Sequence, residues 1–345
     1  MIKPENSIVN LSCSISKEFK APFSHPTISK VDSLINGAYR NVILLVFSGI
    51  GLKEMQKYLS GTGYFSKNFI MPLSSVCPAG PVPGNMSLMT GLCPSEHGYI
   101  ASELYIDSLD KVIDVVHEKD LAKKYLPYET IIEKINRGYV GKAREIKSDN
   151  LDDMIEMVLA ETEIYRKEYI YSYWPYPEDL RGEEEVKDYI KTLEEKIEAM
   201  AKKLSDSILL ITSDHGFKDV KYRNLTDYRD IMEMLERPPS LEGRAKAFYV
   251  KDKYMKDFPK KFKDLFGNDF ELYSKDEVIK KELFGGGLVN KYFKDMIGDY
   301  LAIGHGEISL KNINKGPLSG RGHSGLTREE VEVPLIGISK RRLWF

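Results

Sequence analysis

Four short apolar segments constrain the fold of this 345-residue chain more than any other feature of its sequence. They run over Asn41–Phe47, Glu168–Trp174, Ser207–Thr212 and Val333–Ser339. The first, NVILLVF, is nearly continuous in apolar and β-branched residues, a pattern typical of a strand buried on both faces of a parallel sheet. Helical patterns separate the segments. Strands that alternate with helices predict an α/β fold with a mostly parallel sheet covered on both faces.

The helical patterns between these segments have recognisable periods and ends. The longest runs from Glu183 to Leu204, where apolar residues recur at steps of three and four and form one stripe. Asp149 is expected to cap the helix in the sequence NLDDMIEMVLAE. Later in the chain, Ser274 and Glu277 form a capping box before another apolar run.

The chain divides into a core and an insertion. Residues 218–316 have the pattern of a compact α+β unit placed between two core strands. We therefore expect an α/β core formed by residues 1–217 and 317–345, in which 1–37 are an N-terminal lead, and an inserted subdomain at 218–316. Ligands of open α/β sheets bind beyond the carboxyl ends of the strands, so the insertion could act as a lid there or only enlarge the fold.

Composition excludes several classes of protein. The formal net charge of −2 is too balanced for a protein that binds nucleic acid or a membrane surface through bulk charge. The chain has three cysteines and no C-x-x-C pair, which argues against a disulfide framework or a zinc ribbon. The start of the sequence has no apolar signal-peptide region, and no stretch is long enough to span a membrane, so we expect a cytoplasmic protein. A single glutamine, Gln56, beside many Lys and Glu residues is typical of a thermophilic source.

Three groups of polar residues follow the ends of predicted strands. The sequence FSGIG places Ser48 after the first strand, TSDHGF places Asp214 and His215 after SILLI, and the glycine-rich GRGHSG places His323 before the last strand. Asp oxygen and His nitrogen are typical ligands of zinc and similar divalent ions. The alternative is a turn aspartate, a helix-start histidine and a loop histidine. The three together, each beside glycine, favour the metal site.

Other polar groups have simpler interpretations. Asp179 and Glu183 are four residues apart and could present hard oxygen ligands on one helix face, but an acidic first turn explains them equally well. His25 lies in a Pro- and Ser-rich lead and is expected at the surface. The glycine run 285–287 lacks the Lys-Ser/Thr of a P-loop and gives only a weak phosphate-binding signal.

The order of motifs resembles the type I phosphodiesterase / nucleotide pyrophosphatase family of the alkaline phosphatase superfamily. The matching pieces are NVILLVFSGIG, SLMTGLCPSEHGYIASELY, YWPYPEDLRGEEEV, ILLITSDHGF and GRGHSGLTREEVEVPLIGI, which together span nearly the whole chain. The resemblance implies an alkaline-phosphatase-like α/β sheet and a hydrolase that uses two divalent metals, usually zinc. One metal is held by an Asp after the first strand, by the Thr or Ser nucleophile and by the Asp-His pair. The other is held by a D-x-x-G-H motif and by the late histidine.

The site residues implied by this resemblance match only in part. Matching positions hold Asp214, His215, His323, Asp179 and Gly182. Departing positions hold Ser48 for the first-strand Asp, Glu183 for the His of D-x-x-G-H, and Pro81 for the nucleophile.

These three departures differ in how strongly they affect metal binding and catalysis. Glu183 keeps a ligand oxygen in place of an imidazole, whereas Ser48 replaces a charged ligand with a neutral hydroxyl. Pro81 has neither a hydroxyl nor a backbone N–H, so it can neither attack phosphorus nor donate to an anion. Both losses fall on the metal site that activates the nucleophile, so we expect one bound ion or none, rather than two. A slipped loop could bring Cys77 into the nucleophile position, or Ser48 could take over.

Three functions follow from this comparison. The first is a catalytically impaired phosphodiesterase-like protein that binds a phosphorylated small molecule or nucleotide. The second is a divergent but active metal-dependent phosphoester hydrolase that uses the retained residues Asp179, Asp214, His215 and His323. The third is a non-enzymatic scaffold, because a fold does not fix a function. The sequence leaves the oligomeric state open.

Overall fold

The computed structural model describes residues 5–177, 180, 182–312 and 318–341. Its main sheet has six strands in the order β2 (Phe69–Ser74), β15 (Glu332–Lys340), β7 (Ser207–Thr212), β1 (Asn41–Phe47), β6 (Glu168–Trp174) and β5 (Lys142–Ile146). β1 pairs in parallel with β6 and β7, and β5 pairs in parallel with β6. Only β15 runs antiparallel, between β7 and β2. The predicted mostly parallel α/β sheet is confirmed.

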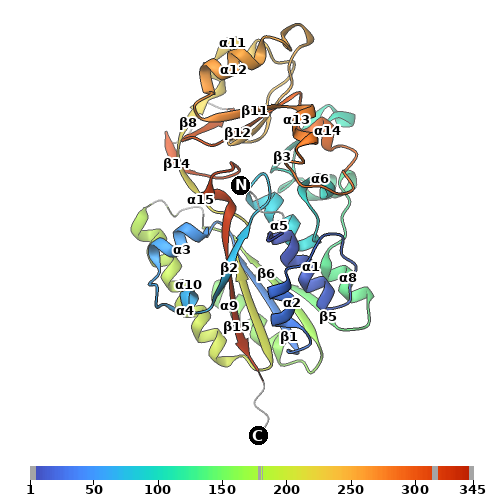
Figure 1. The fold of residues 1–345 in the computed structure, drawn as a ribbon, viewed down its shortest axis with the longest axis vertical. Helices are drawn as coiled ribbons and strands as arrows, with labels where there is room; N and C mark the ends of the chain where they lie inside the picture. Colours follow the sequence, from blue (N-terminus) through green and yellow to red (C-terminus); the bar gives the residue numbers. More distant parts are fainter. Residues whose placement is uncertain (1–4, 178–179, 181, 313–317, 342–345) are drawn as a thin grey trace.

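Helices cover both faces of this sheet (Figure 1). One face carries α1 (Ile8–Glu18), α2 (Ser29–Ile35), α5 (Pro81–Thr90) and α8 (Ile131–Arg137). The other carries α3 (Leu52–Tyr58), α4 (Tyr64–Lys67), α9 (Leu151–Thr162) and α10 (Glu183–Lys203). Alternate residues of β1 serve the two faces: Val42 packs in the first apolar cluster and Ile43 in the second. The continuous apolar run is thereby explained by burial on both sides.

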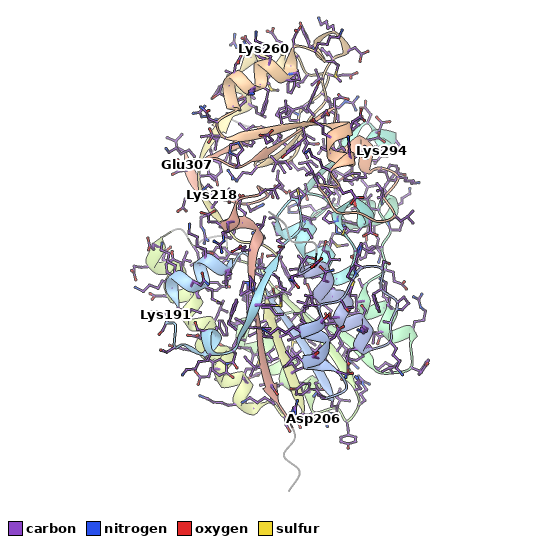
Figure 2. The ribbon with its side chains drawn as sticks, in the orientation of Figure 1. Lys191, Asp206, Lys218, Lys260, Lys294 and Glu307 are labelled. Carbon is purple, nitrogen blue, oxygen red and sulfur yellow. The ribbon has the colours of Figure 1, made fainter. Side chains whose placement is uncertain are left out.

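A second body of structure stands above the carboxyl ends of the main strands in Figure 1. Its four-stranded antiparallel sheet has the order β11 (Phe270–Ser274), β12 (Tyr300–Gly304), β10 (Ala245–Phe248) and β9 (Ser240–Glu242). A three-stranded sheet of β13 (Ile308–Lys311), β8 (Lys218–Asn224) and β14 (Ser319–Gly322) lies at the junction, where Figure 2 labels Lys218 and Glu307. The remaining hairpin is β3 (Glu103–Ile106) with β4 (Lys111–Asp114).

Short helices complete this upper body and its connections. They are α6 (Pro94–His97), α7 (Lys119–Tyr125), α11 (Arg229–Met232), α12 (Phe258–Phe266), α13 (Lys275–Lys280), α14 (Phe293–Met296) and α15 (Arg328–Val331), with single 3₁₀ turns at Asp107–Leu109, Leu225–Asp227 and Asp252–Tyr254. Phe258, Phe262 and Phe266 repeat every four residues along α12 and are all buried in one cluster. Residues of the β3–β4 hairpin share a further apolar cluster with β10 and α14, so the upper body packs on residues from the first third of the chain.

The local predictions can be compared with these elements. Strands β1, β6 and β7 have the predicted bounds, and Ser274 with Glu277 forms the predicted capping box. The helix expected to be capped by Asp149 is α9, and its cap is Asn150 instead. The Asn150 Oδ1 atom accepts hydrogen bonds from the backbone N–H groups of Asp152 and Asp153, at 2.8 and 3.2 Å. No helix of the described ranges combines the length and apolar character needed to cross a bilayer.

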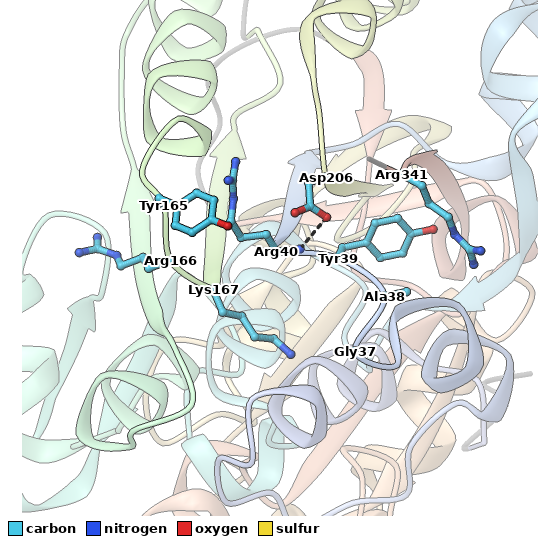
Figure 3. A pocket seen from close by; sticks show the side chains of 9 residues that line it. All are labelled: Gly37, Ala38, Tyr39, Arg40, Tyr165, Arg166, Lys167, Asp206 and Arg341. Carbon is cyan, nitrogen blue, oxygen red and sulfur yellow. Dashed lines mark hydrogen bonds between the residues drawn. The ribbon is translucent and has the colours of Figure 1, made fainter. Parts of the chain in front are cut away.

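One of the cavities lies at the amino ends of the main strands (Figure 3). It has a volume of about 700 Å³, and its lining includes Arg40, Arg166, Lys167, Asp206 and Arg341. Arg40 directly precedes β1 and Asp206 directly precedes β7, so this basic cavity opens at the sheet edge opposite Ser48 and Asp214. It is therefore separate from the site that the sequence predicts.

Candidate active site

The predicted site residues meet where three neighbouring parallel strands end. Ser48 follows β1, Asp214 follows β7, and Tyr173 is the penultimate residue of β6, in register with Val46 of β1. The strand order β7-β1-β6 makes the three side chains neighbours at one edge of the sheet. Ser48 and Asp214 are both buried. The structure thus brings the first-strand position and the Asp-His motif together, as the sequence predicts.

The Asp214 carboxylate is surrounded by protein hydrogen-bond donors. Its Oδ2 atom accepts from the Ser48 hydroxyl at 2.9 Å and from the Tyr173 hydroxyl at 2.8 Å. Its Oδ1 atom accepts from the backbone N–H groups of Gly49, at 3.1 Å, and His215, at 2.8 Å. Burial raises the pKa of Tyr173 well above its ordinary value, so this phenol remains a donor at neutral pH. A carboxylate offers about four lone-pair sites, and four donors occupy them.

His215 and His323 face one another beside this carboxylate. Their ring centroids are 5.0 Å apart, and the Phe217 ring packs edge-on against His215 at 4.9 Å. His215 Nδ1 lies 2.8 Å from the Gly216 carbonyl, which only accepts, so Nδ1 carries the proton and Nε2 keeps its lone pair. Burial and the neighbouring His215 lower the pKa of His323, which favours the neutral imidazole. Two imidazoles thus share a largely buried corner.

The loop expected to hold the nucleophile ends in this corner. Gly80 precedes α5, and a Cβ atom added to it would lie 3.2 Å from His323 Nδ1 and 2.6 Å from the Ser324 hydroxyl oxygen. Further along the helix, a Cβ atom on Gly84 would lie 2.8 Å from the Asp214 Cβ atom. Pro81 is the first residue of α5, a position where proline is favoured because its ring pre-sets the helical backbone. The structure thus places Gly80, the residue before Pro81, against His323 and Ser324.

The alternative nucleophiles are poorly placed for attack. Cys77 is buried in an apolar cluster, and burial raises the pKa of its thiol to about 12, so the thiolate is scarce at neutral pH. Ser75 donates its hydroxyl to the Asp214 backbone carbonyl. Ser48 is committed to the Asp214 carboxylate. Each of these side chains holds the loop or the carboxylate in place.

The remaining predicted ligands are not gathered here. Asp179 lies outside the described residues. Glu183 begins α10, its side chain is 65% exposed, and its carboxylate pairs with Lys57 at 2.8 Å. Among the described residues, Asp214, His215 and His323 do not form a group whose ligand atoms all lie within 4.8 Å of one another. Together with the four donors on Asp214, this arrangement does not fit the pair of metals that the family resemblance implies.

Sequence reasoning missed several residues around this corner. Tyr173 lies in the apolar segment Glu168–Trp174 and was not among the predicted site residues. The upper body also contributes Glu242, at the end of β9, and Lys246, in β10. Burial favours a higher pKa for Glu242, but attraction to the His323 ring in its protonated form and hydrogen bonds from the Ser102 N–H and hydroxyl, at 2.9 and 2.7 Å, hold that pKa below its usual value. Burial lowers the pKa of Lys246, against the opposing charge of Glu242. A lysine flanked by alanines in RAKAF was the available signal.

A buried ion pair joins the upper body to the core beside this corner. The Arg244 guanidinium contacts both carboxylate oxygens of Glu330 in α15, at 2.7 and 3.0 Å. Neither side chain is exposed. Arg244 also donates to the carbonyls of Gly306 and Ile308, at 3.1 and 2.8 Å. A bidentate pair of this kind fixes direction as well as distance, so it positions β9 and β10 over the strand ends.

Comparison with known proteins gives matches in structure alone. No protein-family model matches the chain, and a search of curated proteins finds no significant match. Murine ectonucleotide pyrophosphatase / phosphodiesterase 5 superposes with a TM-score of 0.67 and 16% sequence identity, over 85% of this chain and 87% of its own. The human protein of that name gives a TM-score of 0.66 and 15% identity over 86% and 87%. One murine structure is of an inactive variant in complex with AMP.

A bacterial enzyme matches over a slightly larger share. Phosphonoacetate hydrolase from Sinorhizobium meliloti, in complex with phosphonoformate, superposes with a TM-score of 0.60 and 16% identity, over 89% of this chain and 91% of its own. Identities this low establish the fold alone. The chain therefore has the alkaline-phosphatase-like α/β fold of these phosphodiesterase and phosphonoacetate hydrolase structures, as its ordered sequence motifs predicted.

Proposed function

We propose that this protein is a catalytically impaired relative of the phosphodiesterases that binds a phosphorylated small molecule or nucleotide without turning it over efficiently. The observation that carries the proposal is the environment of Asp214. In place of a metal, the hydroxyls of Ser48 and Tyr173 donate to Oδ2 at 2.9 and 2.8 Å. A metal ion entering there would have to displace donors that already neutralise a buried carboxylate.

The start of α5 supports the same conclusion. Phosphoryl transfer through a covalent intermediate needs a hydroxyl or thiol, and Pro81 supplies neither. The first helical turn also contains Pro83, so of the first three residues of α5 only Val82 has a backbone N–H. Free N–H groups at a helix start are what usually hold a phosphate there. Both attack and phosphate binding by this helix are therefore weakened.

Cationic and polar groups at the same corner support ligand binding. An ammonium has three N–H donors, and Lys246 uses one for the Leu241 carbonyl at 3.2 Å. The Ser324 hydroxyl lies 2.7 Å from His323 Nδ1, which orients the opposite ring nitrogen. These groups suit a phosphate carrying at least one negative charge. The AMP complex of the murine structural neighbour supports a nucleotide as the ligand class.

Hydrolysis and binding are measured separately. With added Zn²⁺ or Mn²⁺, purified protein is expected to hydrolyse bis-p-nitrophenyl phosphate no faster than its His323→Ala variant. A metal-dependent rate that disappears in His323→Ala would refute the impairment and establish a divergent hydrolase. For binding, titration calorimetry with AMP should give heat for the wild type and none for His323→Ala. Without AMP heat in the wild type, the ligand part of the proposal would be wrong and the scaffold interpretation would stand.

A further inference from the structure

A second cluster of reactive side chains lies away from the strand ends. It consists of His25, between α1 and α2, with Cys93 and Glu96, which cap and belong to α6, and we name these three residues the His25 cluster. One ligand atom from each lies within 4.8 Å of the other two. We propose that the His25 cluster binds one zinc-like divalent ion that ties the N-terminal lead to α6.

The contacts within the cluster are close. His25 Nε2 and the Glu96 carboxylate oxygen Oε2 are 2.5 Å apart, and the Cys93 backbone N–H donates to the same oxygen at 2.7 Å. The His25 side chain is 16% exposed and the Glu96 side chain 7%. The His25 imidazole and the Glu96 carboxylate are thus held together by a short contact and are largely buried, while Cys93 is partly exposed. A solvent molecule entering there completes four-coordination.

The donor set is the one that zinc prefers. Thiolate sulfur, imidazole nitrogen and carboxylate oxygen bind Zn²⁺ at about 2.3, 2.0 and 2.0 Å, usually in a tetrahedron. Such bond lengths place donor atoms about 3.3–3.5 Å apart in a tetrahedron, so atoms already within 4.8 Å of one another need only a small rearrangement. The thiolate and imidazole select against Mg²⁺ and Ca²⁺, which prefer oxygen alone.

The glycine run of the upper body encloses this cluster. Gly285 and Gly287 have φ values of +87° and +118°, and Cβ atoms there would lie 2.5 Å from Cys93 Sγ and 2.3 Å from Glu96 Oε1. Only glycine allows the backbone to approach so closely. Ser95 anchors the approach, because its N–H donates to the Phe284 carbonyl at 3.1 Å and its hydroxyl to the Gly285 carbonyl at 2.9 Å. The run that gave a weak phosphate signal in the sequence thus packs over a set of metal donors.

An ion in the His25 cluster would join two segments that are distant in the sequence, beneath a third. The lead contributes His25, the segment after α5 contributes Cys93 and Glu96, and the upper body covers both. Figure 1 shows α6 between α5 and the region of α13 and α14. Metal bonds across segments so far apart in sequence stabilise the folded state, because the unfolded chain does not preform the site.

Cobalt substitution tests this site without interference from the strand-end corner. Co²⁺ bound to a thiolate gives a near-ultraviolet charge-transfer absorption, and Asp214, His215 and His323 contain no sulfur. Titrating Co²⁺ into the metal-free full-length protein should produce this band with one ion per chain, and Zn²⁺ should abolish it. The band should be lost in Cys93→Ser and kept in His323→Ala. Cys77→Ala is the matched control, since Cys77 is a buried cysteine outside the cluster, and it should also keep the band.

Two further variants guard against a folding defect in Cys93→Ser. His25→Ala and Glu96→Gln should each keep the native circular dichroism spectrum and weaken Co²⁺ binding by at least about tenfold, because even outer-shell partners of a metal are worth about 10–100-fold. The proposal is overturned if the wild type shows no charge-transfer band on Co²⁺ addition. It is equally overturned if the band survives Cys93→Ser or if neither His25→Ala nor Glu96→Gln changes the affinity.

Discussion

The hydrogen bonds to Asp214 can be tested by removing its hydroxyl donors one at a time. Tyr173→Phe keeps the ring and deletes the donor 2.8 Å from Oδ2, while Ser48→Ala deletes the donor at 2.9 Å. A hydrogen bond to a buried charged group is worth about 1.5–3 kcal/mol, so each change should lower the free energy of unfolding by that amount. The double variant should lose more than the sum, because Oδ2 then has neither of its side-chain donors.

Urea unfolding measured with EDTA and with Zn²⁺ provides the assay. Because an ion bound in the His25 cluster would itself stabilise the wild type, the comparison is made in Cys93→Ser, whose unfolding midpoint should be the same in both conditions if hydrogen bonds, and not a metal, hold Asp214. Tyr171→Phe is the matched control: its buried hydroxyl donates to Asn85 and not to Asp214, so it should lose only about 1 kcal/mol, the value of a neutral hydrogen bond.

Two results would refute this reasoning about Asp214. The first is that EDTA lowers the unfolding midpoint of the wild type and of Cys93→Ser equally. The stabilising metal would then lie outside the His25 cluster and near the strand ends. The other is a loss below about 0.5 kcal/mol in both Tyr173→Phe and Ser48→Ala, the range of an ordinary surface substitution. In that case neither hydroxyl would stabilise the carboxylate, and a metal could replace them at little cost.

Three further predictions concern pH, the joint between the two bodies, and lost activity. Burial lowers the pKa of His97 to about 3, whereas the unfolded chain binds a proton at this residue below pH 6.5. The folded state is therefore fully stable with respect to this group above pH 6.5, and it loses stability as the pH falls from 6.5 towards 3. Urea unfolding should show that the free energy of unfolding falls by about 2 kcal/mol between pH 7 and pH 5, and His97→Gln should remove this fall. If His97→Gln shows the same pH dependence as the wild type, His97 is not the group responsible. Arg244→Met should destabilise the protein by about 3–5 kcal/mol, because it leaves the Glu330 carboxylate buried without its partner. The double variant Arg244→Met/Glu330→Met should recover much of that loss in urea unfolding. If it recovers none, the loss comes from disturbed packing and not from the unpaired carboxylate. Ser48→Asp combined with Pro81→Thr should hydrolyse bis-p-nitrophenyl phosphate with Zn²⁺ at least about tenfold faster than wild type, with each single change inactive. If the double variant binds zinc but stays inactive, restoring these two positions is not sufficient for hydrolysis.

The main sheet was predictable because its strands are buried on both faces. Three of its strands are short, mostly apolar segments: Asn41–Phe47, Glu168–Trp174 and Ser207–Thr212. Segments of this length and composition, set between helical patterns, favour buried strands. The antiparallel direction of β15 was not predictable, because a buried strand has the same residue pattern in either direction. The cap of α9 was misplaced by one residue because Asp149 and Asn150 are both good capping residues, and only backbone geometry selects Asn150.

The candidate site was predictable where residues follow strands and not where they approach from elsewhere. Asp214 and Ser48 sit directly after strands, so parallel pairing brings them to the same edge. Tyr173 lies within a strand whose other tyrosines pack in the core, and its donor role depends on the turn that aims Asp214 towards it. His25 and Glu96 are separated by 71 positions, and no local pattern links them. Contacts of this kind arise from packing between elements, which a single sequence does not record.

The segment from α5 to α6 connects the two chemical features of this protein. Its first residue, Pro81, stands where the family resemblance implies the nucleophile, and it has no backbone N–H. Its far end presents Cys93 and Glu96 to His25, under the glycine backbone of the upper body. A structural ion needs donors on rigid, well-packed elements but no open coordination position for a substrate, whereas a catalytic metal needs both. The impaired hydrolysis that we propose at one end of the segment therefore places no constraint on metal binding at the other. The cobalt and phosphodiester assays can succeed or fail independently of one another.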